Sequence, residues 1–207
     1  MITIKINNCN NEYKYGQYFN LFYNDEKRPY TPIVSNKLNN IFKFLIKKYD
    51  IKSVSKLICN NYIKDSVIYS KGPFGNNYYD NINDIIIINN KSIENTNIMI
   101  FSCGTGITPF YSIIDNLIIN TKYNIILNAS FRSKDDILLI DKLIDKKINK
   151  LTINLYLSNE NNKLNENKII YLLNKYNNYT ILICGTDNYQ IMIKNICNKY
   201  NIENYIY

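Results

Sequence analysis

Apolar and polar positions alternate along the first part of the chain. The alternating segments are residues 2–6, 18–23, 41–47, 66–69 and 84–88. A period of two is typical of strands that bury one face. Residues 53–59 are the one stretch here with a helical pattern. We therefore expect residues 1–93 to form a small antiparallel β-barrel with one short helix.

From residue 94 onward, short runs of Ile and Leu alternate with segments that carry apolar residues at helical spacing. Strands are expected near residues 98–102, 124–129, 151–157, 180–184 and 204–206. Helices are expected near residues 107–119, 136–148, 166–176 and 188–200. Strands that are apolar on both faces and alternate with helices predict a parallel sheet covered on both sides. Residues 94–207 are therefore expected to form an α/β domain with a five-stranded parallel sheet.

A glycine turn joins the first strand of this second domain to its first helix. It reads Cys103-Gly-Thr-Gly-Ile-Thr-Pro109, and Pro109 suits the first turn of a helix. Such a turn directs free N–H groups and the positive end of a helix dipole at one spot, as a pyrophosphate requires. The sequence alone leaves two interpretations open, a dinucleotide site and an ordinary strand-turn-helix. Cys184 and Gly185 end another strand at the same edge, where ligands of parallel sheets bind.

Composition and charge narrow the classes of function. The chain has 207 residues, no histidine, five cysteines and a formal net charge of +8. Without histidine, Ser-His and Cys-His nucleophilic mechanisms and most zinc sites are excluded, so we expect the chemistry to come from a cofactor, with no metal. The lysines are scattered and no nucleic-acid motif is present, which argues against nucleic acid and leaves an anionic membrane face and an acidic protein partner open.

Cysteine spacing and hydropathy point to a compartment. The five cysteines lie far apart and include no Cys-x-x-Cys pair, as expected of reduced thiols in a cytoplasmic protein. No apolar run reaches about 18 residues, so we expect no transmembrane segment, and no signal peptide opens the chain.

Short motifs in a fixed order carry a family resemblance. They are Gly16-Gln-Tyr18, Arg28-Pro-Tyr-Thr-Pro-Ile33, Lys71-Gly-Pro-Phe-Gly75, Cys103-Gly-Thr-Gly-Ile-Thr-Pro109 and Ile183-Cys-Gly185. Together they resemble the ferredoxin-NADP reductase superfamily, and most closely its NADH-cytochrome b5 reductase branch. The resemblance implies an FAD-binding barrel followed by a nicotinamide-nucleotide domain. It also implies a barrel that lacks its first strand, because residues 3–6 match the second strand of the family.

The resemblance assigns flavin contacts to the barrel. Arg28 would pair with the FAD pyrophosphate, Tyr30 would lie against the isoalloxazine ring, and Thr31 would reach the flavin N5 that accepts the hydride. Pro29 stiffens this segment. A second phosphate contact would come from Ser53, Val54 and Ser55 at the start of the short helix, although Lys52 stands where the family has glycine.

The resemblance also assigns nucleotide contacts, with Thr31 and Cys184 as the catalytic candidates. Gly104, Thr105 and Gly106 would hold the pyrophosphate, Thr108 would border the nicotinamide, and Cys184 and Gly185 would lie beside the reacting carbon. Gly72 and Pro73 would shape the pocket, and Lys47 matches a lysine linked to NADH use.

The choice of dinucleotide stays open at this point. Arg132, Ser133 and Lys134 follow the second strand of the nucleotide domain, where a 2′-phosphate would sit, whereas Asp135 and Asp136 would repel one. Branch membership favours NADH, with NADPH not excluded. The last residue, Tyr207, is expected either to cover the flavin or to end an edge strand.

The resemblance implies an FAD-dependent NADH reductase that passes electrons to an acidic one-electron acceptor such as a cytochrome b5-like haem protein. Two alternatives remain: a superfamily reductase for an iron-sulfur protein or an oxygenase, and a degenerate module that binds a nucleotide or a partner without turnover.

Overall fold

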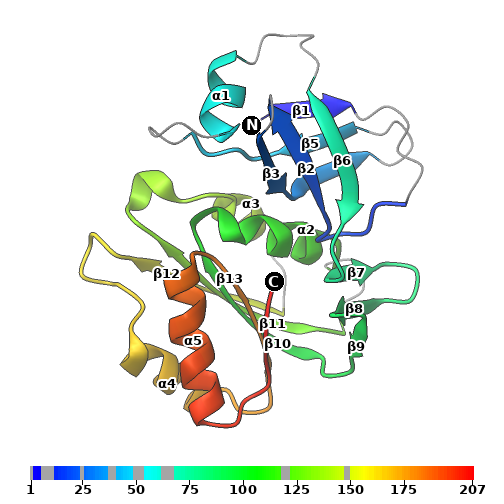
Figure 1. The fold of residues 1–207 in the computed structure, drawn as a ribbon. Coiled ribbons are helices and arrows are strands. Elements are labelled where there is room, and N and C mark those ends of the chain that lie inside the picture. Colours follow the sequence, from blue (N-terminus) through cyan, green and yellow to red (C-terminus); the bar gives the residue numbers. More distant parts are fainter. Residues whose placement is uncertain are drawn as a thin grey trace.

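The computed structural model describes the chain with a few gaps. The described residues are 2–5, 12–23, 26–36, 41–48, 54–61, 68–117, 122–146 and 150–207. Figure 1 shows two parts, an N-terminal group of strands and a C-terminal sheet flanked by helices, with helix α2 lying between them. No helix of the described residues has the length and apolarity needed to cross a bilayer.

The N-terminal part consists of short antiparallel strands and one helix. The elements are β1 (Ile2–Lys5), β2 (Tyr18–Tyr23), β3 (Glu26–Tyr30), β4 (Pro32–Asn36), β5 (Ile41–Phe44), α1 (Val54–Asn61) and β6 (Tyr69–Phe74). They form two sheets, with orders β1-β5-β4 and β3-β2-β6. Only Thr31 separates β3 from β4, so the chain passes from one sheet into the other at that residue. Within the described residues, β1 and β6 each pair on one side only, which leaves both as sheet edges.

Alternating side chains of these sheets build a separate small core. Phe19 and Leu21 on β2 and Phe42 and Phe44 on β5 are all at most 1% exposed. Val54 of α1 joins the same cluster, so the short helix closes one side of the barrel. This core explains why the period-two pattern of the sequence predicts these strands correctly.

A third small sheet connects the barrel to the nucleotide domain. Its strands are β7 (Tyr78–Asp80), β8 (Ile85–Ile88) and β9 (Lys91–Ile93), paired antiparallel in that order. Asp80 organises the turn after β7, because its carboxylate accepts the backbone N–H groups of Ile82 and Asn83 at 3.1 and 3.4 Å. Lys14 donates to the same carboxylate at 2.8 Å, and the pKa of Asp80 falls to about 2, chiefly through this contact.

Replacing Asp80 by Ala is therefore expected to destabilise the protein. Loss of these charge-assisted hydrogen bonds costs about 2 kcal/mol, or a melting temperature lower by about 4–8 °C at pH 7. The folded-state pKa of Asp80 lies below the unfolded value of about 4, so this stabilisation is present above pH 4 and is lost as the pH falls toward 2. Thermal melts between pH 2 and 7 measure the effect. The exposed Asp145→Ala is the control, and equal melting temperatures for the two variants at pH 7 would contradict the assigned role.

The C-terminal part is a parallel sheet with helices on both faces. The strands are β10 (Asn97–Cys103), β11 (Asn124–Phe131), β12 (Leu151–Leu157), β13 (Thr180–Cys184) and β14 (Asn204–Ile206). The helices are α2 (Thr108–Leu117), α3 (Ile140–Ile144), α4 (Glu166–Lys175) and α5 (Asp187–Lys199). The strand order is β12-β11-β10-β13-β14, with every pair parallel. Helices α4 and α5 cover one face and α2 covers the face toward the barrel (Figure 1). The expected fold class, antiparallel strands followed by a five-stranded parallel sheet, is confirmed.

Three expected elements differ from the structure. In place of a helix over 136–148, a 3₁₀ turn (Lys134–Asp136) precedes the five-residue α3. Leu139 has φ of +66°, a left-handed conformation that no helix passes through, so α3 cannot begin before Ile140. The strand expected at 41–47 ends at Phe44, and β6 begins at Tyr69 rather than at residue 66, which lies outside the described part.

Candidate functional site

The glycine turn after β10 has the geometry expected of an anion cradle. Residues Gly104–Ile107 form a 3₁₀ turn that leads directly into α2. Gly104 has φ of +56°, and a Cβ added there would meet nothing within 4 Å, so the backbone at this point faces open space. The Thr108 hydroxyl donates to the carbonyl of Thr105 at 3.0 Å and fixes the turn against the helix. The turn therefore offers free backbone at the N-terminal end of α2.

Two glycines let the ends of β10 and β13 approach closely. A Cβ on Gly106 would lie 2.5 Å from the carbonyl oxygen of Cys184 and 3.0 Å from the nitrogen of Gly185. A Cβ on Gly185 would lie 2.8 Å from the Cβ of Cys103. Neither position has room for a side chain. The structure thus brings the Gly104–Gly106 turn and the Cys184-Gly185 pair, which are far apart in sequence, into one site.

Both cysteines of this site are protonated thiols near neutral pH. Burial raises the pKa of Cys184 to about 12. Burial also raises the pKa of Cys103, although a hydrogen bond from the backbone of Thr186 and the charge of Lys47 oppose the rise. The Cys184 side chain is therefore uncharged, so it can pack beside a ring but is a poor nucleophile.

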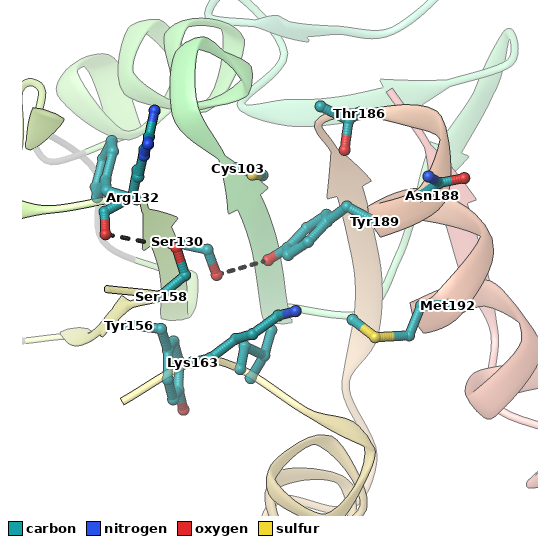
Figure 2. A pocket seen from close by; sticks show the side chains of 12 residues that line it. Cys103, Ser130, Arg132, Tyr156, Ser158, Lys163, Thr186, Asn188, Tyr189 and Met192 are labelled. Atoms are coloured by element: carbon teal, nitrogen blue, oxygen red, sulfur yellow. Dashed lines mark hydrogen bonds between the residues drawn. The ribbon is translucent and has the colours of Figure 1, made fainter. Parts of the chain in front are cut away.

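A cavity of about 400 Å³ extends from this site across the ends of β11 and β12. It is lined by Cys103, Ser130, Phe131, Arg132, Tyr156, Ser158, Lys163, Leu164, Thr186, Asn188, Tyr189 and Met192. Figure 2 shows Ser130, Lys163, Tyr189 and Met192 directed toward one another and Tyr156 of β12 beside Lys163, whereas the side chain of Arg132 is directed away from them. The Tyr189 hydroxyl and the Ser130 hydroxyl are 3.2 Å apart, and the Tyr189 hydroxyl also donates to the carbonyl of Ser102 at 3.2 Å.

Sequence reasoning missed most of this cavity. Four of its lining residues belong to no short motif, so the sequence does not mark them as site residues: Tyr156, Lys163, Tyr189 and Met192. The signal available was their position, because Tyr156 lies at the end of β12 and Tyr189 in the first turn of α5, both at the carboxyl edge of the sheet.

The flavin candidates of the barrel lie on β3 and at the start of α1. Arg28 and Pro29 are exposed, whereas Tyr30 and Thr31 are half-buried. Val54 and Ser55, in the first turn of α1, are buried, and α1 packs against β2 and β3. Ser53 lies outside the described residues. Because Thr31 directly precedes β4, which packs against α2, the flavin candidates and the glycine turn belong to neighbouring elements.

The remaining barrel candidates, Gly72 and Pro73, lie on β6. Gly72 has φ of +150°, and a Cβ there would lie 2.8 Å from the ring of Phe19 and 2.9 Å from the carbonyl oxygen of Tyr18. Glycine is therefore required at this position for β6 to approach β2.

Lys47 joins the barrel to the nucleotide domain. Its ammonium group donates to the Asp136 carboxylate at 2.7 Å, and the Ser133 hydroxyl donates to the other oxygen of that carboxylate at 3.0 Å. The Lys47 contact is the largest cause of the lowered pKa of Asp136. The charge of Lys47 also acts to lower the pKa of the Cys103 thiol, which directly precedes the glycine turn. By pairing with Lys47, Asp136 therefore holds a positive charge near that turn.

A Lys47→Ala variant tests whether that charge serves the dinucleotide. We expect the KM for NADH to rise about tenfold, since one charge-assisted contact is lost, with little change in kcat. Steady-state kinetics with ferricyanide as acceptor measures both constants. The neighbouring exposed Lys48→Ala is the matched control, and an equal KM for the two variants would rule out the role of Lys47.

Tyr207 ends the edge strand of the sheet. Its N–H donates to the carbonyl of Ile183 at 2.8 Å, which continues the ladder of β14, and its hydroxyl donates to the carbonyl of Asn77 at 2.7 Å. The ring packs edge-on against Phe110 of α2 with centroids 5.0 Å apart. The structure therefore places Tyr207 directly after the edge strand β14, and a contact of its ring with the flavin stays a prediction.

The residues present fit a dinucleotide and a flavin. The open backbone at Gly104, the close approach at Gly106 and the cavity beyond them suit a pyrophosphate and an adenosine. On the barrel, the exposed Arg28 precedes the half-buried Tyr30, which matches the needs of a phosphate and an apolar ring. The fold and site together define a two-domain nucleotide-binding protein of the flavoprotein reductase class.

Comparisons with known proteins agree with this class. Residues 2–79 match the family described as Oxidoreductase FAD-binding domain, and residues 95–204 match Ferric reductase NAD binding domain. NADH-cytochrome b5 reductase 1 of Dictyostelium discoideum is 37% identical over 125 residues, which is 58% of this chain and 39% of that protein. NADH-cytochrome b5 reductase 2 of Candida albicans is 25% identical over 177 residues, 78% of this chain and 54% of that protein. The chain thus spans about half the length of these relatives or less.

A solved structure is similar as well. The cytochrome b5 reductase domain of Ulva prolifera nitrate reductase matches with a TM-score of 0.77 and 18% identity, over 94% of this chain and 85% of that one. The NAD-binding match alone covers more than half of the chain. The chain belongs to the ferredoxin-NADP reductase superfamily, with an FAD-binding and an NAD-binding domain of the cytochrome b5 reductase type.

Proposed function

We propose that this protein is an FAD-dependent NADH oxidoreductase that passes electrons one at a time to an acidic protein acceptor. The observation that carries the proposal is the close approach of the glycine turn to the Cys184-Gly185 pair, at the start of α2. Helix α2 packs against β4, which directly follows Arg28, Tyr30 and Thr31 in the chain. When bound, FAD supplies the conversion of a two-electron donor into single electrons. The chain itself needs to supply position and electrostatics, and no acid or base.

The principal candidate residues have the following roles in this proposal. Gly104, Thr105 and Gly106 bind the dinucleotide pyrophosphate, and Thr108 and Cys184 border the nicotinamide. Arg28 binds the flavin pyrophosphate with Ser55 and the start of α1, Tyr30 lies against the flavin ring, and Thr31 donates a hydrogen bond to it. Burial of the Cys184 thiol keeps it neutral beside a reacting ring, which supports a purely steric role.

The domain boundary belongs to the proposal too. We place it between residues 93 and 94, with the FAD-binding domain before it and the NAD-binding domain after it. The end of β9 at Ile93 and the start of β10 at Asn97 support this division. The two family matches, which end at residue 79 and begin at residue 95, are compatible with it.

A cytochrome b5-like haem protein is the acceptor that the relatives favour, since both curated relatives are named for cytochrome b5. The net charge of +8 supports an acidic acceptor, mainly through the rate of association. The widely spaced cysteines support a reducing compartment such as the cytoplasm.

The visible spectrum of the purified chain supplied with FAD, before and after anaerobic NADH, tests the proposal. A bound-flavin spectrum that bleaches within the mixing time is the expected result. Reduction of cytochrome b5 that becomes slower as salt is added supports an acidic acceptor. Fast reduction of ferricyanide without reduction of cytochrome b5 indicates instead that the acceptor is an iron-sulfur protein or an oxygenase. A protein that retains no flavin, or whose bound flavin stays oxidised, would instead be a non-catalytic binding module.

A further inference from the structure

The five-stranded sheet of the nucleotide domain ends on one side at β12, and this edge is open along most of its length. In the described part of the chain, β12 pairs in parallel with β11 and with no other strand. The N–H of Ser158, just after β12, donates to the carbonyl of Phe131 in β11 at 3.0 Å. Backbone groups of successive strand residues point to opposite sides, so the even-numbered residues of 150–158 face β11 and the odd-numbered residues face outward.

The loop after β12 covers only the carboxyl end of this outward side. Asn162 donates from its side-chain amide to the carbonyl of Leu155 at 3.0 Å, and its backbone carbonyl accepts the N–H of Leu157 at 3.2 Å. Among the described residues, none forms a hydrogen bond with the outward N–H and carbonyl groups of Leu151 and Ile153. These groups are therefore available to a further strand.

Other edge strands of the molecule carry features that prevent such pairing. Strand β1 ends in Lys5, and β6 contains both Lys71 and Pro73. Strand β14 has only three residues. In contrast, β12 has seven residues and contains no charged side chain, no proline and no glycine. Charge, proline and short length are the usual protections of an edge strand, so β12 is the least protected of these four.

The side chains of β12 also leave apolar surface at this edge. Only Leu157 of its seven residues is buried, whereas the inner strand β11 buries six of its eight. Leu151, Ile153 and Leu155 are half-buried and pack on one face against the core of the domain. A strand added here would gain contacts with these side chains as well as hydrogen bonds.

We propose that β12 pairs antiparallel with β12 of a second copy of this chain, around a twofold axis at Ile153. Ile153 then lies opposite its own counterpart and Leu151 lies opposite Leu155, so the outward groups of both strands are satisfied and the two sheets become one. The net charge of +8 opposes contact between two copies, and an uncharged strand is a place where they can meet. An acidic partner would instead favour the edges that carry lysine.

Sedimentation velocity of the FAD-loaded protein between about 1 µM and 1 mM tests the proposal. We expect a reversible dimer with a dissociation constant of about 10–100 µM, because the contact is small. Ile153→Lys and Ile153→Glu are each expected to weaken the dimer at least tenfold, since like charges then face each other across the axis. An equal mixture of the two variants is expected to dimerise again, because Lys then lies opposite Glu.

Ile206→Lys is the matched control, because it places the same charge on β14 at the opposite edge of the sheet. It is expected to dimerise as wild type does. The inference does not depend on the proposed function, and three results would overturn it. They are a wild type that stays monomeric up to about 1 mM, an equal loss in Ile206→Lys, and a mixture that stays monomeric although both Ile153 variants melt near wild type.

Hydrogen exchange locates the contact without any substitution. The N–H of Ile153 faces outward and that of Thr152 faces β11. We expect exchange at Ile153 to slow at least threefold between dilute and concentrated protein, and exchange at Thr152 to stay the same. A dimer that leaves exchange at Ile153 unchanged uses another surface and contradicts the inference. Protection of Ile153 that requires added cytochrome b5 would assign this edge to a different protein and contradict it as well.

Discussion

Replacing Gly106 by Ala is expected to raise the KM for NADH about 100-fold. The added Cβ would lie 2.5 Å from the carbonyl oxygen of Cys184, so one of the two backbone segments must move by about 1 Å. Both segments contact the dinucleotide in the proposed function, and a displacement of that size at a positioning group costs about two orders of magnitude. Stopped-flow reduction of the bound flavin by NADH, compared with the dissociation constant of NAD⁺, separates lost binding from slowed chemistry.

Ile191→Ala provides the control on the same domain. Ile191 lies on α5, is 54% exposed and does not line the cavity. We expect its KM for NADH to equal that of wild type, while both variants melt within a few degrees of wild type. If Gly106→Ala leaves the KM for NADH as it is in Ile191→Ala, the close approach to Cys184 is not what the cradle depends on.

The strands of the nucleotide domain are predictable because each is a short segment rich in Ile, Leu or Tyr between helical segments. β12, β13 and β14 begin and end at the residues expected from the pattern alone. Apolar side chains of these strands pack into the hydrophobic clusters of the domain. The helix expected over 136–148 was wrong because a local feature, the left-handed Leu139, overrides the helical spacing of the residues that follow.

The strands of the barrel that escaped prediction carry proline or charge. β3 reads Glu-Lys-Arg-Pro-Tyr and β4 begins at Pro32, and these residues disfavour strands by propensity. Pairing of β3 with β2 and of β4 with β5 stabilises them nonetheless. Pairing with neighbouring strands therefore determines that these residues form β3 and β4. The sequence itself indicates only the Arg28–Ile33 motif at this place.

The cavity was beyond the reach of sequence reasoning for a different reason. Gly106 and Gly185 each belong to a short motif, so the cradle could be inferred from the chain. Lys163 is one lysine among many, and only the fold shows that its side chain enters the cavity while Lys134 does not. Which lysines contribute charge to the cavity depends on the path of the loop before α4. The spacing of residues in the sequence does not predict that path.

Replacing Arg28 by Ala is expected to weaken FAD binding by about 10- to 100-fold. A guanidinium group forms two parallel hydrogen bonds with a pyrophosphate, and loss of this charge-assisted contact as a whole costs about 1.5–3 kcal/mol. Arg28 is exposed on β3 opposite Leu21 of β2, so its truncation removes no core packing. Arg28→Lys keeps the charge but not the fork, and we expect an intermediate loss. Quenching of flavin fluorescence on titration into the apoprotein gives the dissociation constants.

Lys27→Ala is the control that separates this role from general electrostatics. Lys27 lies next to Arg28 on the same strand, and side chains of successive strand residues point to opposite faces. Both variants lower the net charge by one and leave the register of β3 unchanged. If the long-range charge of the barrel attracts FAD, the two substitutions weaken binding alike. If Arg28 contacts the pyrophosphate, only its own substitution does so, and added salt weakens FAD binding to Lys27→Ala as much as to wild type.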